Sequence, residues 1–400
     1  MKIYTLTSSL HDAAAVDRLG DEFLSAIGLD FEIKGQDFSD YDRGLIYVRT
    51  GGSEGIFKSI LPSLPKERPF YLLTSGKSNS LAASMEILSF LGQQGLRGEI
   101  LHGAPERLRE RILEIEALDG AWEKLRGARF GVIGRPSDWL ISSGADYGLV
   151  RERLGAELID IPMEELTSRI REVDDIPEAL KAVPCRREEK VAPALSGAYS
   201  IYLALKEIAD VYNLSGLTLR CFDLLTSVRN TGCLGLALLN SEGKVATCEG
   251  DIPAMLSMAV AEALTGCPGF QCNPAEMSPE KGEILFAHCT LPLSMARRYN
   301  FDTHFESGIG AGIHGEIPEG PVTIFKLSGD LSRAFIQEAS LISNDYGENL
   351  CRTQIRLRLP EGCKAIEDYF LKNPIGNHHI VLPGCHAAAL RAFFSSICQK

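Results

Sequence analysis

The feature that most constrains the fold is an alternation of short apolar segments with longer segments of helical periodicity. Residues 44–49 and 69–73 are apolar runs that end in Gly- or Ser-rich turns, which is typical of buried parallel strands. Residues 81–91 and 105–115 carry apolar side chains at helical spacing. Strands that alternate with helices favour parallel α/β layers. We therefore expect a Rossmann-like α/β domain over residues 1–126.

The same alternation continues past residue 126. Strand-like apolar runs occur at 129–133, 157–161 and 218–222, and an amphipathic helical stretch covers 198–211. We expect a second Rossmann-like α/β domain over residues 127–283.

The pattern changes at about residue 284. Strand-like runs separated by Gly-rich turns follow at 285–288, 322–327 and 352–359, with one such turn at 308–315 and a final helix expected at 386–397. The polar and apolar side chains of residues 352–359 alternate, which is typical of an antiparallel sheet or barrel. We expect residues 284–400 to form a C-terminal β-rich domain.

Composition excludes several classes of partner. The formal net charge is −12, and such a surface repels nucleic acid and anionic lipid. No apolar run approaches the roughly 20 residues that a spanning helix needs, and the N-terminal residues lack the apolar centre of a signal peptide. We expect a cytoplasmic protein whose cysteines are reduced thiols.

Histidines are concentrated near the C-terminus. Six of the eight lie in the last third of the chain: His288, His304, His314, His378, His379 and His386. Histidine is a common metal ligand and acid–base group. This region is therefore where we expect ligands, although some of the six must be ordinary core or surface residues.

Two carboxylates stand directly before an apolar helical segment at 252–264. Glu249 and Asp251 flank Gly250, and Pro253 suits the first turn of the helix. A purely structural interpretation is available, in which Asp251 caps the helix and Glu249 is a solvated loop residue. A functional interpretation needs further residues.

Those residues complete a resemblance that covers most of the chain. They lie in the segments 265–273, 286–289, 376–379 and 384–386, and further matching segments are 79–86, 131–139, 304–310 and 351–354. With these segments, the chain resembles the L-fucose isomerase and L-arabinose isomerase family, particularly its short, fucose-isomerase-like members. The resemblance implies two α/β domains and a C-terminal β-barrel that enclose a divalent metal, usually manganese.

The resemblance also implies a set of site residues. Glu249 matches the first metal-binding carboxylate, which doubles as an acid–base group. His378 matches the late histidine ligand, and His288 matches the additional histidine of arabinose-type members. Asn273 stands where the family has its second carboxylate. An amide oxygen can bind a hard cation, but it carries no charge and takes no proton at neutral pH.

Further residues are candidates for supporting roles. Asp251 is a second catalytic candidate that would compensate for the missing carboxylate. His379, His386 and Arg352 are candidates for substrate binding. The resemblance also implies a homo-oligomer, a trimer or a hexamer.

These observations favour a metal-dependent aldose–ketose isomerase that acts on an open-chain sugar or sugar derivative through an enediol. Glu249 would transfer the proton. The negative surface favours an uncharged sugar over a multiply phosphorylated one. Two alternatives stay open: a sugar-binding or regulatory protein with a degenerate site, and another metal-assisted reaction such as epimerisation or carbon–carbon cleavage.

Overall fold

The computed structural model describes residues 1–360 and 363–398. The chain divides into two compact units, Met1–Ala117 and Leu118–Lys400. The expected three-domain division at residues 126 and 283 stays a prediction.

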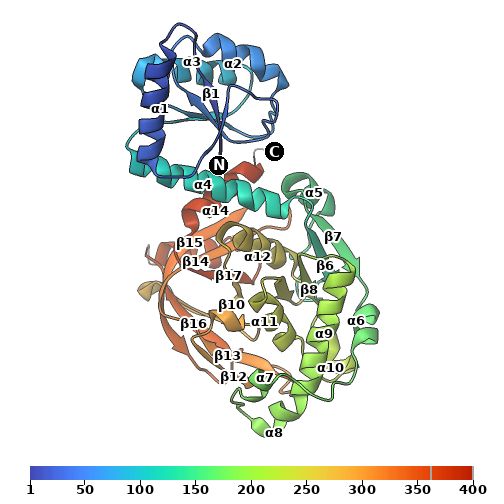
Figure 1. Cartoon of the computed structure of the whole chain (residues 1–400). Helices are drawn as coiled ribbons and strands as arrows, with labels where there is room; N and C mark the ends of the chain where they lie inside the picture. The colour runs from blue at the N-terminus through green and yellow to red at the C-terminus, as the bar shows by residue number, and fades with distance from the viewer. Residues whose placement is uncertain (361–362, 399–400) are drawn as a thin grey trace. The chain divides into compact units, whose positions relative to one another are not determined.

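The first unit is a parallel sheet with the strand order β2-β1-β3-β4-β5, covered by helices on both faces (Figure 1). The strands are β1 (Lys2–Leu6), β2 (Glu32–Gly35), β3 (Leu45–Val48), β4 (Phe70–Leu73) and β5 (Gly98–Leu101). The helices are α1 (Ala13–Ile27), α2 (Glu54–Ile60), α3 (Ser80–Gln93) and α4 (Pro105–Leu125).

Strand β3 shows why an unbroken apolar run becomes a central strand. Leu45 and Tyr47 belong to a core cluster with Ile112 of α4. Ile46 belongs to a different cluster, with Phe57 of α2. Successive side chains of a strand point to opposite faces, so a strand without polar positions must be covered on both sides.

The second unit begins with a four-stranded parallel sheet in the order β7-β6-β8-β9. Its strands are β6 (Arg129–Ile133), β7 (Glu157–Ile161), β8 (Gly216–Leu219) and β9 (Val245–Cys248). The helices of this region are α5 (Tyr147–Leu154), α6 (Met163–Arg169), α7 (Glu178–Lys181), α8 (Glu188–Val191), α9 (Leu195–Val211), α10 (Asp223–Ser227), α11 (Cys233–Ser241) and α12 (Ile252–Thr265).

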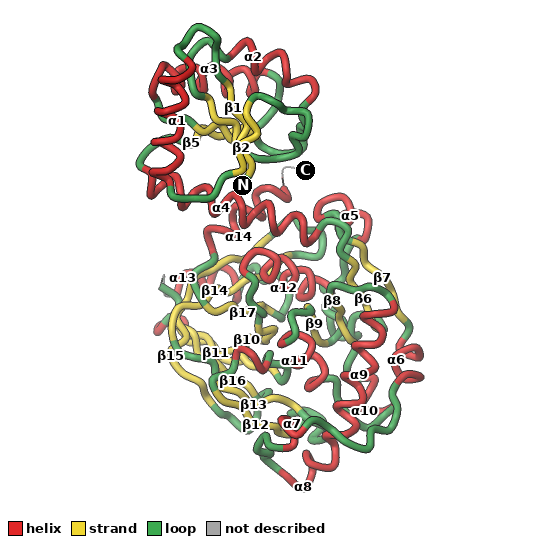
Figure 2. Tube along the Cα trace, viewed as in Figure 1, coloured by secondary structure: helices red, strands yellow, loops and turns green. Residues whose placement is uncertain are grey.

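A closed antiparallel barrel follows, with the strand order β10-β11-β16-β15-β14-β17 (Figure 2). Its strands are β10 (Phe270–Ser278), β11 (Glu283–His288), β14 (Gly320–Leu327), β15 (Ala334–Asp345), β16 (Thr353–Arg358) and β17 (His379–Pro383). Strands β12 (Arg298–Asp302) and β13 (Gly312–Glu316) form a separate pair, and helices α13 (Cys363–Ala365) and α14 (Ala387–Cys398) lie near the C-terminus. Two parallel α/β sheets followed by an antiparallel barrel confirm the predicted fold class.

Helix α12 lies between the parallel sheet and the barrel of the second unit (Figure 1). Its Met255 and Leu256 share one core cluster with Phe130 of β6 and with Phe325 and Ile380 of the barrel strands. The helix is buried along almost its whole length. It therefore fixes the residues at its N-terminus against the barrel.

The predicted turn at 308–315 is only partly a turn, because Gly312–Glu316 forms β13. A Cβ at Gly315 would lie 2.4 Å from Cδ2 of Leu291. A strand tolerates glycine where a neighbour approaches this closely. The glycine-rich composition of this segment therefore reflects close packing as well as turning.

Within residues 1–360 and 363–398, every helix is too short or too polar to cross a lipid bilayer.

Candidate metal centre

The connection between β9 and α12 is a tight left-handed turn. Glu249 has φ 64° and Gly250 has φ 69°. A Cβ at Gly250 would lie 2.4 Å from the carbonyl oxygen of Arg135, so this position requires glycine. Glu249 is not glycine, and a side chain held in this backbone region is strained. The peptide oxygen of Glu249 is held by the N–H of Ser137 at 2.9 Å.

This turn brings Glu249 to two histidines of the barrel. His288 ends β11, and His378 directly precedes β17. Oε1 of Glu249 lies 3.3 Å from Nε2 of His378 and 3.8 Å from Nε2 of His288. One ligand atom from each residue lies within 4.8 Å of the other two, and all three residues are buried.

The second nitrogen of each imidazole is already engaged. Nδ1 of His378 donates to Oδ2 of Asp251 at 2.9 Å, and Nδ1 of His288 shares a hydrogen bond of 2.9 Å with Oγ1 of Thr290. Such bonds fix the ring orientation and direct Nε2 to the site. Among the described residues, none forms a hydrogen bond with the buried Nε2 of His378.

This donor set fits a divalent cation. A buried imidazole nitrogen without a hydrogen bond costs free energy unless something else occupies its lone pair. Two imidazoles and one carboxylate are a common ligand set that leaves other coordination positions open. Glu249, His288 and His378 were all expected as ligands from the sequence, and the structure brings them together.

The charges of the cluster reinforce one another. Burial opposes ionisation of Glu249, but the charge of His378 and the nearby ring of His288 hold the pKa of its carboxyl well below its usual range. Burial likewise opposes protonation of His378, yet Glu249 and Asp251 raise its pKa to about 9. A cation that binds at Nε2 must therefore displace a proton from His378.

Trp139 also contacts the cluster. Its Nε1–H donates to Oε2 of Glu249 at 2.6 Å, while 52% of the residue is exposed. Its ring packs edge-on against Phe222, which packs edge-on against His304. The sequence analysis did not single out Trp139 as a site residue, although it ends one of the segments that carried the resemblance.

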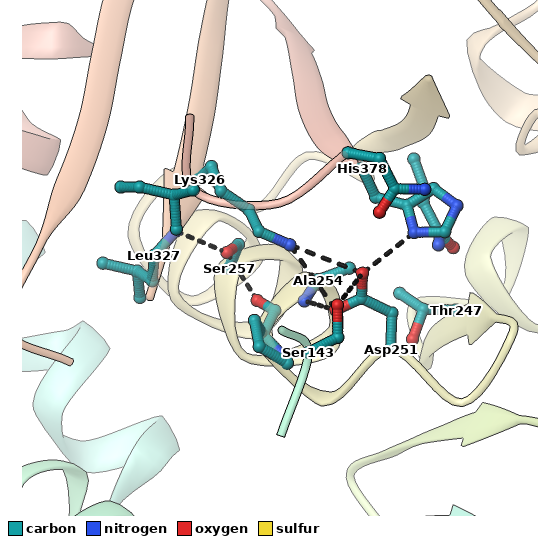
Figure 3. Close-up of polar contacts among 12 residues, drawn as sticks. Ser143, Thr247, Asp251, Ala254, Ser257, Lys326, Leu327 and His378 are labelled. Carbon is teal, nitrogen blue, oxygen red and sulfur yellow. Dashed lines mark hydrogen bonds and ion pairs between the residues drawn. The ribbon is translucent and has the colours of Figure 1, made fainter. Parts of the chain in front are cut away.

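Asp251 lies beside the ring of His378 (Figure 3) and is fully buried. Oδ1 accepts from the N–H of Ala254 at 2.7 Å, which confirms that Asp251 caps the helix. The other half of that interpretation is wrong, because Glu249 is buried and is not a solvated loop residue. Oδ2 accepts from Ser143 Oγ at 3.4 Å as well as from His378. Burial raises the pKa of Asp251, but Lys326 and His378 outweigh it and bring the pKa to about 2. These contacts hold the carboxylate in place, so Asp251 can fix the position of the His378 ring. A role of Asp251 in proton transfer stays a prediction.

Asn273 lies beside the cluster on β10, paired with Ala287, the residue before His288. Its Oδ1 accepts a hydrogen bond of 3.0 Å from Nδ2 of Asn377, the residue before His378. A role for Asn273 as metal ligand stays a prediction.

His379 and His386 have structural partners. Burial lowers the pKa of His379 to about 3, so its ring is neutral. Its Nδ1 donates to the carbonyl oxygen of Asn377, and Nε2 accepts from Tyr369. His386 lies beyond the opposite end of β17, with Nε2 2.8 Å from the carbonyl oxygen of Pro383. Both ring nitrogens of His379 are therefore engaged by the protein. The expected roles of His379 and His386 in substrate binding stay predictions.

Arg352 precedes β16 and is buried. Its Nε and Nη2 donate to Thr303, and Nε lies 3.7 Å from Oδ2 of Asp302. Nη1 is buried and has no hydrogen-bond partner within the part of the chain that the structure describes. Substrate binding by Arg352 stays a prediction.

Comparison with curated proteins identifies similar enzymes. The chain is 24% identical to a sulfoquinovose isomerase of Alkalicoccus urumqiensis over 62% of this chain and 59% of that protein. It is 26% identical to a sulfoquinovose isomerase of Clostridium sp. (strain MSTE9) over 56% of this chain and 50% of that protein. It is 25% identical to a sulfoquinovose isomerase of Priestia aryabhattai over 55% of this chain and 52% of that protein. The chain thus spans between half and three fifths of the length of these relatives.

Comparisons with family models and with solved structures give no support for a function. No family model matches the chain. A solved structure of D-threo-3-hydroxyaspartate dehydratase from Delftia sp. HT23 aligns with 97% of this chain and 84% of its own, at 13% identity and a TM-score of 0.16, which is too low to support an argument.

Proposed function

We propose that this protein is a metal-dependent aldose–ketose isomerase that acts on an open-chain sugar through an enediol. The observation that carries the proposal is the convergence of Glu249, His288 and His378, whose ligand atoms lie within 4.8 Å of one another. Similarity to sulfoquinovose isomerases supports the same reaction class. The expected membership of the L-fucose and L-arabinose isomerase family stays part of the proposal, as does assembly into a trimer or hexamer.

Glu249 is the proposed base. Isomerisation moves a proton from C2 to C1 of the aldose and another from the C2 hydroxyl to the carbonyl oxygen. The Glu249 carboxyl has a lowered pKa, so it is ionised at neutral pH and free to accept the C2 proton. Trp139 fixes the orientation of its Oε2. A bound divalent cation, manganese in our proposal, would polarise the carbonyl and stabilise the charge of the enediolate.

A sulfonated sugar is the substrate class that the relatives suggest. The net charge of −12 does not steer an anion to the protein. Local positive charge must therefore bind it, and the buried Nη1 of Arg352 has no hydrogen-bond partner among the described residues. This preference replaces the uncharged sugar that the surface charge favoured.

The test is hydrogen exchange during turnover. We expect manganese-loaded protein, incubated with sulfoquinovose in heavy water, to form a ketose that NMR detects together with deuterium at C2 of recovered aldose. D-glucose and L-fucose serve as uncharged comparison sugars. Glu249→Gln is the control, and it should show no exchange. Absence of exchange and of ketose with every sugar would contradict an isomerase.

A second candidate function is sugar binding without turnover. Asn273 favours it, because this amide takes the place of a carboxylate and is hydrogen-bonded to Asn377. Calorimetry that detects sugar binding by protein that produces neither exchange nor ketose would support this alternative.

A further inference from the structure

A fully buried lysine reaches the carboxylate that holds His378. Lys326 lies on barrel strand β14 and is 1% exposed. Its Nζ lies 3.5 Å from both carboxylate oxygens of Asp251. Figure 3 shows the Asp251 carboxylate between Lys326 on one side and the ring of His378 on the other. The three groups form a continuous chain from the barrel interior to the candidate metal centre.

Burial of this ammonium group needs an explanation. Transfer of a lysine charge from water into a protein interior is costly, and an apolar side chain would fill a barrel position more cheaply. Lys326 pairs with Asp251, and beyond Asp251 lies the ring of His378. A buried ion pair of this kind contributes little to stability, so its value must lie in what it orients.

The pair also joins the two halves of the site. Glu249 and Asp251 belong to the turn before α12, whereas His288 and His378 belong to the barrel. The adjacent residue, Leu327, makes a second link, because its N–H donates to Oγ of Ser257 on α12 at 2.8 Å. Ser257 has no hydrogen bond to Asp251; its own hydroxyl donates to the carbonyl oxygen of Pro253.

We propose that Lys326 is a positioning residue for the metal centre: its charge holds the Asp251 carboxylate against Nδ1 of His378 and so keeps Nε2 directed at Oε1 of Glu249. The inference rests on the proposed function only in requiring that a divalent cation binds at this cluster. Lys326 acts through Asp251, the residue that its Nζ contacts.

The test measures Mn²⁺ affinity by calorimetry, with no turnover required. We expect Lys326→Met, a variant of similar length without charge, to bind Mn²⁺ about 10- to 100-fold more weakly, the loss typical of removing an outer partner of a metal ligand. Ser257→Ala is the matched control, because it removes the neighbouring link between α12 and β14. It should bind Mn²⁺ within about twofold of the unaltered protein.

Further outcomes separate this inference from its alternatives. Circular dichroism checks that each variant is folded. Unchanged affinity in folded Lys326→Met overturns the inference and leaves the proposed function intact. An equal loss in Ser257→Ala overturns it too, because docking of α12 alone would explain the loss. If the unaltered protein does not bind Mn²⁺, both the inference and the proposed metal centre are wrong.

A second comparison covers the case in which Lys326→Met does not fold. In Asp251→Asn the carboxylate is gone, so an added Lys326→Met change should alter Mn²⁺ affinity by less than about twofold. A further tenfold loss in this double variant would show that Lys326 acts independently of Asp251, which contradicts the inference.

Discussion

Nε2 of His378 lies 3.3 Å from Oε1 of Glu249, although one residue directly precedes a barrel strand and the other follows a strand of a parallel sheet. Helix α12 makes this approach possible, because it starts three residues after Glu249 and packs on both layers. The candidate site is thus a product of the junction between two architectures. Each layer alone supplies only part of the donor set.

Replacement of Glu249 by glutamine should abolish the centre while preserving the fold. Glutamine keeps the length of the side chain and an oxygen that accepts from Trp139, but it removes the negative charge between the two histidines. We expect Mn²⁺ affinity to fall by more than about 100-fold and the isomerisation rate by about 10²- to 10⁴-fold. Calorimetry and NMR turnover assays measure the two effects. Near-normal turnover by a folded variant would show that the base is another residue.

Gly250→Ala should destabilise the protein and displace Glu249. The new Cβ would lie 2.4 Å from the carbonyl oxygen of Arg135, and φ 69° is unfavourable for alanine. We expect a loss of about 3 kcal/mol or more in the free energy of unfolding, measured by denaturant titration.

The control for this prediction is Gly266→Ala. Gly266 ends α12 with φ 67°, but nothing lies within 4 Å of its added Cβ. The free energy of unfolding of Gly266→Ala should fall by only about 1–2 kcal/mol, because alanine disfavours this left-handed backbone conformation. Equal losses in the two variants would show that the contact with Arg135 is unimportant.

Local signals in the sequence predicted much of this arrangement. The unbroken apolar run of β3 indicated a strand covered on both faces, and Asp251 before an apolar segment indicated a helix cap. The resemblance then selected Glu249, His288 and His378, which the structure brings together. These features depend on residues near in sequence or on a recognised pattern.

Features that depend on long-range packing could not be predicted in this way. Strand β10 carries Asn273, Pro274 and Glu276, a polar stretch that is typical of a loop, and it becomes a strand only by pairing with β11 and β17. Lys326 lies in an apolar segment where a lysine suggests an exposed position. Its partner Asp251 is distant in sequence, so no local pattern could indicate the pair.

Protonation of His378 predicts how stability depends on pH. Its pKa in the folded protein is about 9, above the 6.5 of an ordinary histidine. A raised pKa gives stability that is complete below about 6.5 and is lost as the pH rises through about 9. We expect chelator-treated protein to become less stable between these values, as measured by denaturant titration. The decrease in the free energy of unfolding between these pH values should be smaller in His378→Gln. An equal decrease in that variant would show that other groups cause it.

The same proton predicts the pH dependence of metal binding. Mn²⁺ must replace the proton on His378, so its affinity should rise as the pH increases from about 6.5 towards about 9. Calorimetry in buffers of different ionisation enthalpy would detect the released proton. Binding without proton release would show that Nε2 of His378 is not a ligand.

Asn273→Asp tests the departure from the pattern of the L-fucose and L-arabinose isomerases that the chain resembles. Aspartate keeps an oxygen that accepts from Nδ2 of Asn377, so we expect the fold to be retained. A carboxylate next to the strand position that precedes His288 adds negative charge to the donor set. More charged ligands bind a hard cation more tightly, and we expect Mn²⁺ affinity to rise by about tenfold or more.

Asn377→Asp is the matched comparison, because it adds the same charge to the other member of the amide pair. If position 273 faces the cation, Asn273→Asp should strengthen binding more than Asn377→Asp does. Equal effects would indicate a general electrostatic contribution, and no gain in Asn273→Asp would remove this residue from the ligand set. In the latter case the centre would consist of Glu249, His288 and His378 alone.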